Sequence, residues 1–311
     1  MIVFLVRRFF GLIFVLFAVT FLTFLIGHAA PGDPIQIILG FHYDPATYHR
    51  LRHFYGLDQP LLQQYVQYVW HIIRYWNFGY SYQYGGRPVA TILGTALPVT
   101  FTIGLSALAL AVVIGVPVGV YAAGKRNQVG DRLSMAAMLV LYSVPSFVLI
   151  PLMVGVDIWL SQHRYPSLPV ANWGTVQQAV LPILALSAGT IAYVARLTRT
   201  TMVGMLREDF IRTARAKGLT RRRIVLGHAL RPALLPVVTF LGPAIAGLVT
   251  GTFVVEFIFN LPGVGFTAVQ SIESRDYPVV QGATIVVAVI VVLMNLLADI
   301  LYRVLDPRIQ E

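Results

Sequence analysis

The sequence predicts an all-α polytopic membrane protein with six transmembrane helices. Of its 311 residues, 57% are hydrophobic and 12% are charged, and the mean hydropathy is +0.73. This balance is far from that of a soluble domain. In addition, six apolar runs reach the roughly 20 residues that cross a hydrocarbon core about 30 Å thick. They lie near residues 9–29, 98–123, 134–158, 178–197, 236–258 and 280–301.

The first apolar run has two interpretations. Arg7 and Arg8 precede it, as in a secretory signal peptide. However, it is longer than the roughly 7 to 15 apolar residues of such a peptide, and the residues 28–30 are a poor cleavage site. We therefore expect a retained first span.

The segment 30–97 that follows is mixed in character. Residues 61–76 carry apolar and aromatic side chains at helical spacing among polar ones. This pattern favours an amphipathic helix that lies on the membrane or on the domain over a further span. Asp44 and Pro45 are typical of a helix start, and Gly56 of a helix end.

That short helix would place His49 and His53 four residues apart on one face, which raises the alternative of a metal site. Two imidazoles are an incomplete ligand set, and Arg50 and Arg52 add positive charge beside them. We expect surface histidines and no metal. The chain has no cysteine, so thiolate sites and disulfides are excluded.

The distribution of basic residues predicts the orientation. Most of the 23 Lys and Arg residues lie before the first span, in 124–133, in 196–231 or after the last span. Cytoplasmic segments retain such residues. Both termini and the loop 198–235 should therefore be cytoplasmic, and the segment 30–97 extracytoplasmic. Span ends and anionic lipid account for the net charge of +10, so no nucleic-acid partner is expected.

The loop 198–235 has its own helix signals. Asp209 can begin a helix over about two turns, Gly218 can end it in the left-handed conformation, and Thr220 can cap a second helix that runs toward Leu230. Small residues such as Ala214 and Gly218 allow close approach of another surface. An ordinary solvated connector is the alternative. Because a loop this long with caps of its own is usually functional, we favour a docking element for a cytoplasmic partner.

Polar residues within the apolar runs are the other candidates, because a carboxylate in the membrane is costly. We expect Glu256 to face a transport pathway or gate, with an interhelical hydrogen bond as the alternative. Asp157 and Asp299 lie near span ends, and Asn295 can bond between helices. Ser143, Ser146 and Gly251 are small residues that suit close helix packing or a polar conduit.

Several motifs together resemble a known family, the permease subunits of binding-protein-dependent ABC importers in the dipeptide, oligopeptide and nickel group. In that family a cytoplasmic loop carries E-A-A, three residues and Gly, then a later Leu-Pro. Arg212 to Leu219 matches the peptide-permease form R-T-A-R-A-K-G-L, although the acidic residue is absent. Further matching segments are Ala30 to Pro34, Tyr55 to Pro60, Phe78 to Ser81, Ser143 to Phe147, Asn260 to Gly265, Arg275 to Pro278 and Asp299 to Arg308.

The resemblance implies a type I, methionine-importer-like permease fold over residues 1–311, in a prokaryotic inner membrane. It also implies four partners: a homologous second permease subunit, two cytoplasmic ABC ATPases and an extracytoplasmic solute-binding protein. ATP and magnesium would bind those ATPases and not this chain. The cargo would be a di- or oligopeptide, with nickel or a short oligosaccharide as alternatives. The implied coupling residues are Asp209, Arg212, Thr213, Ala214, Ala216, Lys217, Gly218 and Leu219.

Two rival functions remain. A passive channel or stand-alone secondary carrier would need no ATPase contact. A membrane-bound enzyme would need a catalytic constellation within the spans, and the sequence offers none. We therefore expect a transport subunit.

Overall fold

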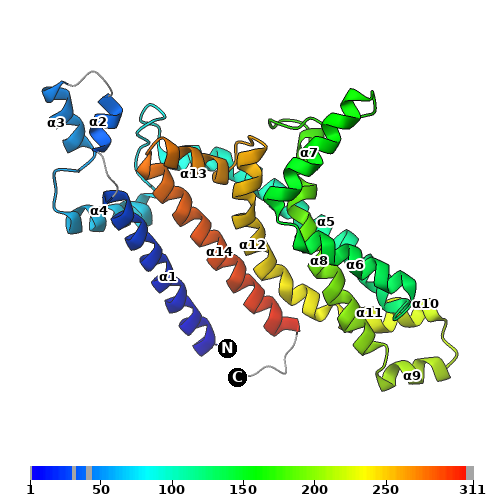
Figure 1. Cartoon of the computed structure of the whole chain (residues 1–311). Helices are drawn as coiled ribbons and strands as arrows, with labels where there is room; N and C mark the ends of the chain where they lie inside the picture. The colour runs from blue at the N-terminus through cyan, green and yellow to red at the C-terminus, as the bar shows by residue number, and fades with distance from the viewer. Residues whose placement is uncertain (1, 30–32, 40–43, 306–311) are drawn as a thin grey trace. The chain divides into compact units, whose positions relative to one another are not determined.

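The computed structural model describes residues 2–29, 33–39 and 44–305. Apart from an isolated bridge between Tyr80 and Pro88, these residues form helices, turns and connections (Figure 1). The helices are α1 Ile2–Ala29, α2 Pro34–Leu39, α3 Pro45–Phe54, α4 Leu61–Tyr75, α5 Val89–Gly124, α6 Val129–Ser143, α7 Ser146–Gln162, α8 Val176–Met205, α9 Asp209–Ala216, α10 Arg221–Arg223, the π-helix η1 Ile224–Ala229, α11 Leu230–Ala233, α12 Leu235–Ile258, α13 Val264–Glu273 and α14 Tyr277–Leu305. The motif residues 30–32 and 306–308 lie outside the described residues.

The chain divides into two compact units. One comprises Met1–Thr100 and Pro262–Val292, and the other Phe101–Leu261 and Leu293–Glu311. We call them the first unit and the second unit. The long helices α5 and α14 each contribute to both.

Among the described residues, five helices are long and apolar enough to span a membrane, namely α1, α5, α8, α12 and α14. They correspond to five of the six predicted spans. The remaining one, predicted as a single run over 134–158, is two helices, α6 and α7, which meet at an angle of 105°. Pro145 causes the break, because proline disfavours a helical residue before it. Val144 is accordingly extended, with ψ at 113°.

The first unit holds the amphipathic helix that the sequence predicts. Tyr65 of α4 packs among Phe17, Phe21 and Phe24 of α1, and its hydroxyl lies 3.1 Å from that of Thr20. The start of α3 is also as predicted. The Asp44 carboxylate accepts hydrogen bonds from two backbone N–H groups of its first turn, so α3 is capped at the expected residue.

The second unit is built around α8, which packs against α6, α7 and α12. Thr175 and Gln178 form a capping box at the start of α8. Helix α5 approaches α8 at two glycines. A Cβ at Gly119 would lie 2.6 Å from the Ala195 carbonyl oxygen, and one at Gly115 would lie 2.9 Å from that of Ile191. Only glycine fits this backbone contact.

Candidate functional site

The candidate site is the predicted docking loop, and its central element is α9. Helix α9 begins at Asp209 and ends through two backbone bonds, from Leu219 N–H to the Ala214 carbonyl at 3.3 Å and from Gly218 N–H to that of Arg215 at 2.9 Å. This pair of bonds is the Schellman arrangement, which requires a left-handed residue after the helix. Gly218 supplies it with φ at +73°. The sequence therefore predicted both the helix and the residue that ends it.

Helix α9 has one face toward its own unit. Ile211 is fully buried and Ala214 is 7% exposed. They join a cluster, here called the loop base, in which α9 packs on the ends of α5 and α8 and on the second helix of the loop. Its buried members are Ala123, Met202, Ile211, Ala214, Ile224, Ala229 and Ala233. Because the loop base is hydrophobic, it stabilises α9 as part of the second unit.

The opposite face of α9 is open to solvent. The Asp209 and Arg212 side chains, 90% and 76% exposed, form an ion pair at 3.1 Å, and Phe210 is 45% exposed. Such an exposed pair adds little stability. Of the eight predicted coupling residues, Ala214 and Leu219 pack on the loop base. The other six are exposed: Asp209, Arg212, Thr213, Ala216, Lys217 and Gly218. We call these six residues and Phe210 the outer face.

The second helix of the loop starts after Thr220, as predicted, although the Thr220 side chain makes no capping bond. It runs through α10, η1 and α11 to Ala233. The sequence pattern did not indicate the π-helical turn. It precedes Pro232, which has no N–H to give to the carbonyl of His228, so the helical ladder changes register there.

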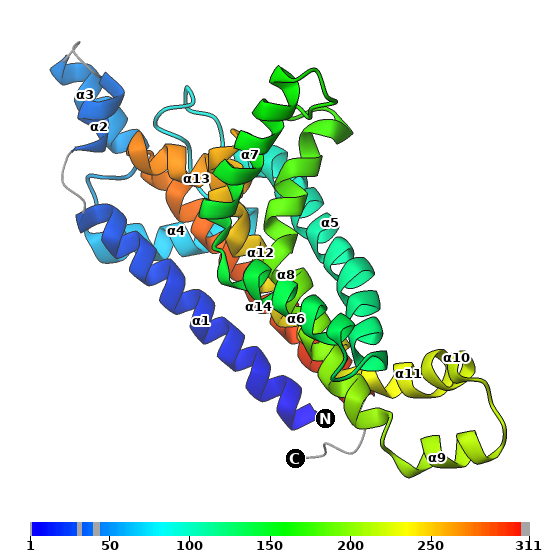
Figure 2. The same cartoon turned by 45° about the vertical axis from the view of Figure 1, so that its right-hand side comes forward.

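Two polar contacts join the loop and its neighbours. Arg221 donates a hydrogen bond of 2.6 Å to the Gly124 carbonyl at the end of α5. Arg199 of α8 donates two hydrogen bonds, both of 2.6 Å, to Asp131 in the first turn of α6. Figure 2 shows α9, α10 and α11 beyond the lower ends of α5 and α8. Packed and hydrogen-bonded contacts therefore connect the loop to α5 and α8, and α8 to α6.

The predicted pathway residues are dispersed over the second unit. Glu256 is fully buried, so its side chain does not face lipid. Ser143 is exposed and donates to the Leu139 carbonyl at 2.8 Å, and Ser146 begins α7 beyond the break. A Cβ on Gly251 would lie 3.3 Å from Leu186, which indicates close helix packing. Among the other polar candidates, Asp157 accepts the Leu168 N–H at 2.8 Å.

The first unit contains a buried carboxylate that the sequence did not single out. Asp276, fully buried, accepts a hydrogen bond from the Ser81 hydroxyl and from the backbone N–H groups of Tyr82 and Gln83, the latter two at 3.0 and 3.3 Å. Two family motifs, Phe78 to Ser81 and Arg275 to Pro278, are thereby joined. The available signal was an Asp before Tyr-Pro at the start of an apolar run.

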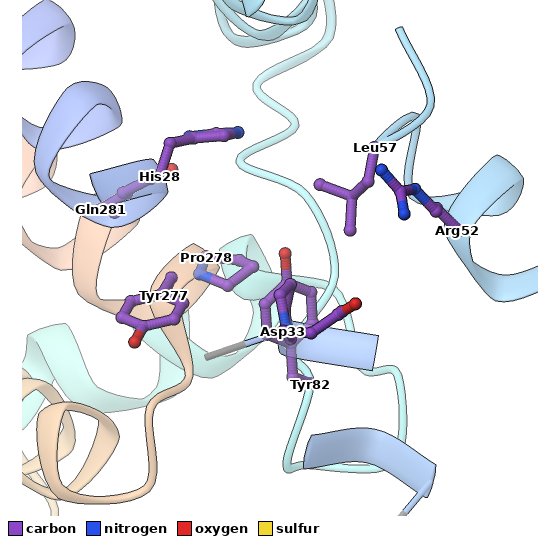
Figure 3. A pocket seen from close by; sticks show the side chains of 10 residues that line it. His28, Asp33, Arg52, Leu57, Tyr82, Tyr277, Pro278 and Gln281 are labelled. Atoms are coloured by element: carbon purple, nitrogen blue, oxygen red, sulfur yellow. The ribbon is translucent and has the colours of Figure 1, made fainter. Parts of the chain in front are cut away.

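A pocket of about 220 Å³ lies in the same unit (Figure 3). Figure 3 shows His28 and Gln281 on one side of it and Arg52 and Leu57 on the other. Asp33 accepts a hydrogen bond of 2.5 Å from Tyr48, whose hydroxyl in turn accepts one from Arg52 at 3.1 Å. Tyr82 lines this pocket, and its burial raises the pKa of its hydroxyl above the usual value.

The predicted histidine pair does not form a metal site within the described ranges. His53 hydrogen-bonds to Asp58 at 2.7 Å. That bond holds the pKa of the Asp58 carboxyl below its usual range. Over the part of the chain that the structure describes, no group of three or more His, Cys, Asp or Glu side chains is arranged to hold a metal ion.

Comparison with models of known protein families shows the family to which this chain belongs. Residues 115–311 match the model of the binding-protein-dependent transport system inner membrane component, and residues 1–104 match that of its N-terminal region. The chain belongs to this family. It is therefore a multi-pass inner-membrane subunit of a binding-protein-dependent ABC importer, and it is the permease and not the ATPase.

Relatives of this permease span its full length. The dipeptide transport system permease protein DppB of Bacillus subtilis is 39% identical, covering 99% of this chain and 97% of its own. The oligopeptide transport system permease protein OppB of Haemophilus influenzae is 38% identical, covering 95% of both chains. The glutathione transport system permease protein GsiC of Escherichia coli is 38% identical, covering 98% of both.

The fold agrees with a solved importer. A chain of the MetNI methionine ABC transporter superposes with a TM-score of 0.55 at 20% identity, covering 70% of the permease and 97% of that chain. This match confirms the predicted methionine-importer-like fold.

Proposed function

We propose that the permease forms one half of the membrane pathway of an ATP-driven importer for di- or oligopeptides. A homologous second permease would complete the pathway. A solute-binding protein would deliver the peptide from outside, and two ATPase subunits would act on the cytoplasmic side, where both termini of this chain lie. The chain itself binds no ATP or magnesium, which belong to the ATPase subunits.

The peptide class is supported by the names of the relatives. Three of them, each matched over at least 95% of both chains, are called transporters of dipeptide, oligopeptide and glutathione. In addition, the segment Arg212 to Leu219 has the peptide-permease form of the coupling motif. Nickel and short oligosaccharides are the alternatives that the transport test below distinguishes.

The observation that carries the coupling role is the division of α9 into two faces. Its inner face is fixed to the loop base, whereas its outer face is exposed and has no partner surface among the described residues of the second unit. An ATPase that binds the outer face and moves it on closure displaces the loop base as well. The base in turn shifts the ends of α5 and α8, and the pathway alternates between outward and inward access.

The test is transport in proteoliposomes. The chain is co-expressed with the second permease and the ATPases encoded beside it, reconstituted, and supplied with the binding protein and radiolabelled dipeptides, tetrapeptides, nickel or maltose. We expect uptake of a peptide that requires both ATP and the binding protein. ATP-dependent uptake of nickel or sugar alone would reject the peptide class. Uptake that continues without ATP would instead support a passive channel or secondary carrier.

A further inference from the structure

A hollow of about 490 Å³ lies at the end of α5 in the second unit. Its walls come from the last turn of α5 and from α10 and η1, and we call it the basic hollow. Its apolar lining comes from Val120, Tyr121, Val225 and Leu226, and its cations are Lys125, Arg221 and Arg222. No Asp or Glu lines it. The hollow therefore combines an apolar wall with three positive charges.

The cations differ in their availability. Arg221 already donates to the Gly124 carbonyl at 2.6 Å, so it holds α10 against the end of α5. Lys125 and Arg222 are exposed, and the structure gives neither of them a salt bridge with a carboxylate among the described residues. Two cations at the mouth are thus available to a bound anion.

The apolar wall continues along the spanning helix. Val113, Pro117 and Tyr121 follow one another at intervals of four residues, so they lie on neighbouring turns along one side of α5. Lys125 follows directly after the end of the helix. All four are exposed, with Val113 at 67% and Tyr121 at 53%. Because α5 spans the membrane, this stripe is a track for a hydrocarbon chain that ends at a cation.

We propose that the basic hollow binds one anionic phospholipid. Its phosphate lies between Lys125 and Arg222, and one acyl chain lies along Val113, Pro117 and Tyr121. The apolar residues lie along the spanning helix and the cations lie at its end, as the acyl chain and the headgroup of a phospholipid do. Cationic pockets beside spanning helices are suited to bind anionic headgroups. The site lies at the contact between α5 and the loop base, so a bound lipid would brace that contact. The inference rests on the membrane location of the family and not on the transported substrate.

The test uses the full chain in detergent, titrated with phosphatidylglycerol that carries a fluorophore at the end of one acyl chain. Each cation near a membrane surface contributes about fivefold in affinity, so Lys125→Gln with Arg222→Gln should weaken binding about 25-fold. The matched control is Arg126→Gln with Arg223→Gln, which removes the same charge from exposed neighbours that do not line the hollow. We expect the control to bind as the wild type does. Equal losses in the two double variants would overturn the proposal, because summed charge would then explain binding.

Two further measurements distinguish an anionic phospholipid from a neutral lipid and from a free anion. Phosphatidylcholine with the same acyl chains should bind more weakly, and inorganic phosphate should not displace the labelled lipid. Displacement by inorganic phosphate would mean a site for free anions. Lipid binding that survives Lys125→Gln with Arg222→Gln, while co-purification of the ATPase is lost, would mean that the hollow is a protein contact. Either result would overturn the lipid assignment.

Discussion

Arg199 of α8 donates one hydrogen bond to each carboxylate oxygen of Asp131 in the first turn of α6, both at 2.6 Å. The Asp131 side chain is 4% exposed and that of Arg199 is 27% exposed. The Asn127 N–H adds a third bond to the carboxylate at 2.9 Å. The pair fixes the connection between α5 and α6 to α8, beside the loop that carries α9.

We predict that Asp131→Ala destabilises the permease strongly, because it leaves the Arg199 guanidinium without its partner. Removing one partner of a buried ion pair lowers the free energy of unfolding by about 3 to 5 kcal/mol. Because the Arg199 side chain is partly exposed, we expect a loss at the lower end of this range. Thermal unfolding of the full chain in detergent measures the loss. The double variant with Arg199→Ala should lose less than the sum of the single variants. Additive losses would mean that the pair contributes no coupling energy.

The two faces of α9 should respond differently to truncation. Ile211→Ala removes a fully buried side chain and should cost about 2 to 5 kcal/mol of stability. Phe210→Ala removes a neighbouring exposed side chain, so we expect an unchanged melting temperature and weaker co-purification of the ATPase. If Phe210→Ala lowered the melting temperature and Ile211→Ala weakened only the co-purification of the ATPase, the docking surface would not be the outer face of α9.

Gly218 has two possible roles, which substitution can separate. Within this chain a Cβ at Gly218 would meet nothing within 4 Å, so the cost of Gly218→Ala comes from the left-handed backbone and is about 1 kcal/mol. Asn tolerates that conformation and adds bulk. If a partner approaches closely, Gly218→Asn should keep the fold and lose ATP-driven uptake. Full uptake in Gly218→Asn would restrict the role of Gly218 to ending α9.

The sequence predicted the local features of the molecule well. Length and hydropathy indicated the spans, and the Asp209 to Gly218 segment predicted α9 with its end, because both signals depend on neighbouring residues. The break at Pro145 was the exception. Apart from Ser143 and Ser146, the residues around it are apolar, so the run was predicted as one span although the proline was visible within it.

Features that join distant segments were not predicted. The Asp131 to Arg199 pair links residues 68 positions apart, and nothing in either local pattern identifies the partner. The inward direction of Ala214 depends on the packing of the loop base. Asp276 appeared in the sequence only as part of the motif Arg275 to Pro278, and only the folded chain brings Ser81 to it.

Asp276 also supplies a prediction for the first unit. Asp276→Ala leaves the Tyr82 N–H without its acceptor, a loss that costs about 1 to 3 kcal/mol when the group is buried. It also removes one of two acceptors of the Gln83 N–H, which donates to the Ser81 hydroxyl as well, at 3.1 Å. We expect faster amide hydrogen exchange over residues 80–84. Asp58→Asn, which changes an exposed carboxylate, is the control and should leave this segment unchanged. Equal exchange in both variants would contradict the structural role of Asp276.

In the proposed importer, the outer face of α9 is the docking surface for an ATPase. The chain has no cysteine, so a single cysteine reports position without background. Ala216→Cys lies on the outer face, whereas Ser167→Cys lies in the exposed segment that follows α7. In the co-expressed complex, a short thiol-reactive cross-linker should join the ATPase to the chain carrying Ala216→Cys and not to that carrying Ser167→Cys. An intact, ATP-hydrolysing complex with no cross-link from Ala216→Cys would contradict this docking role of the outer face.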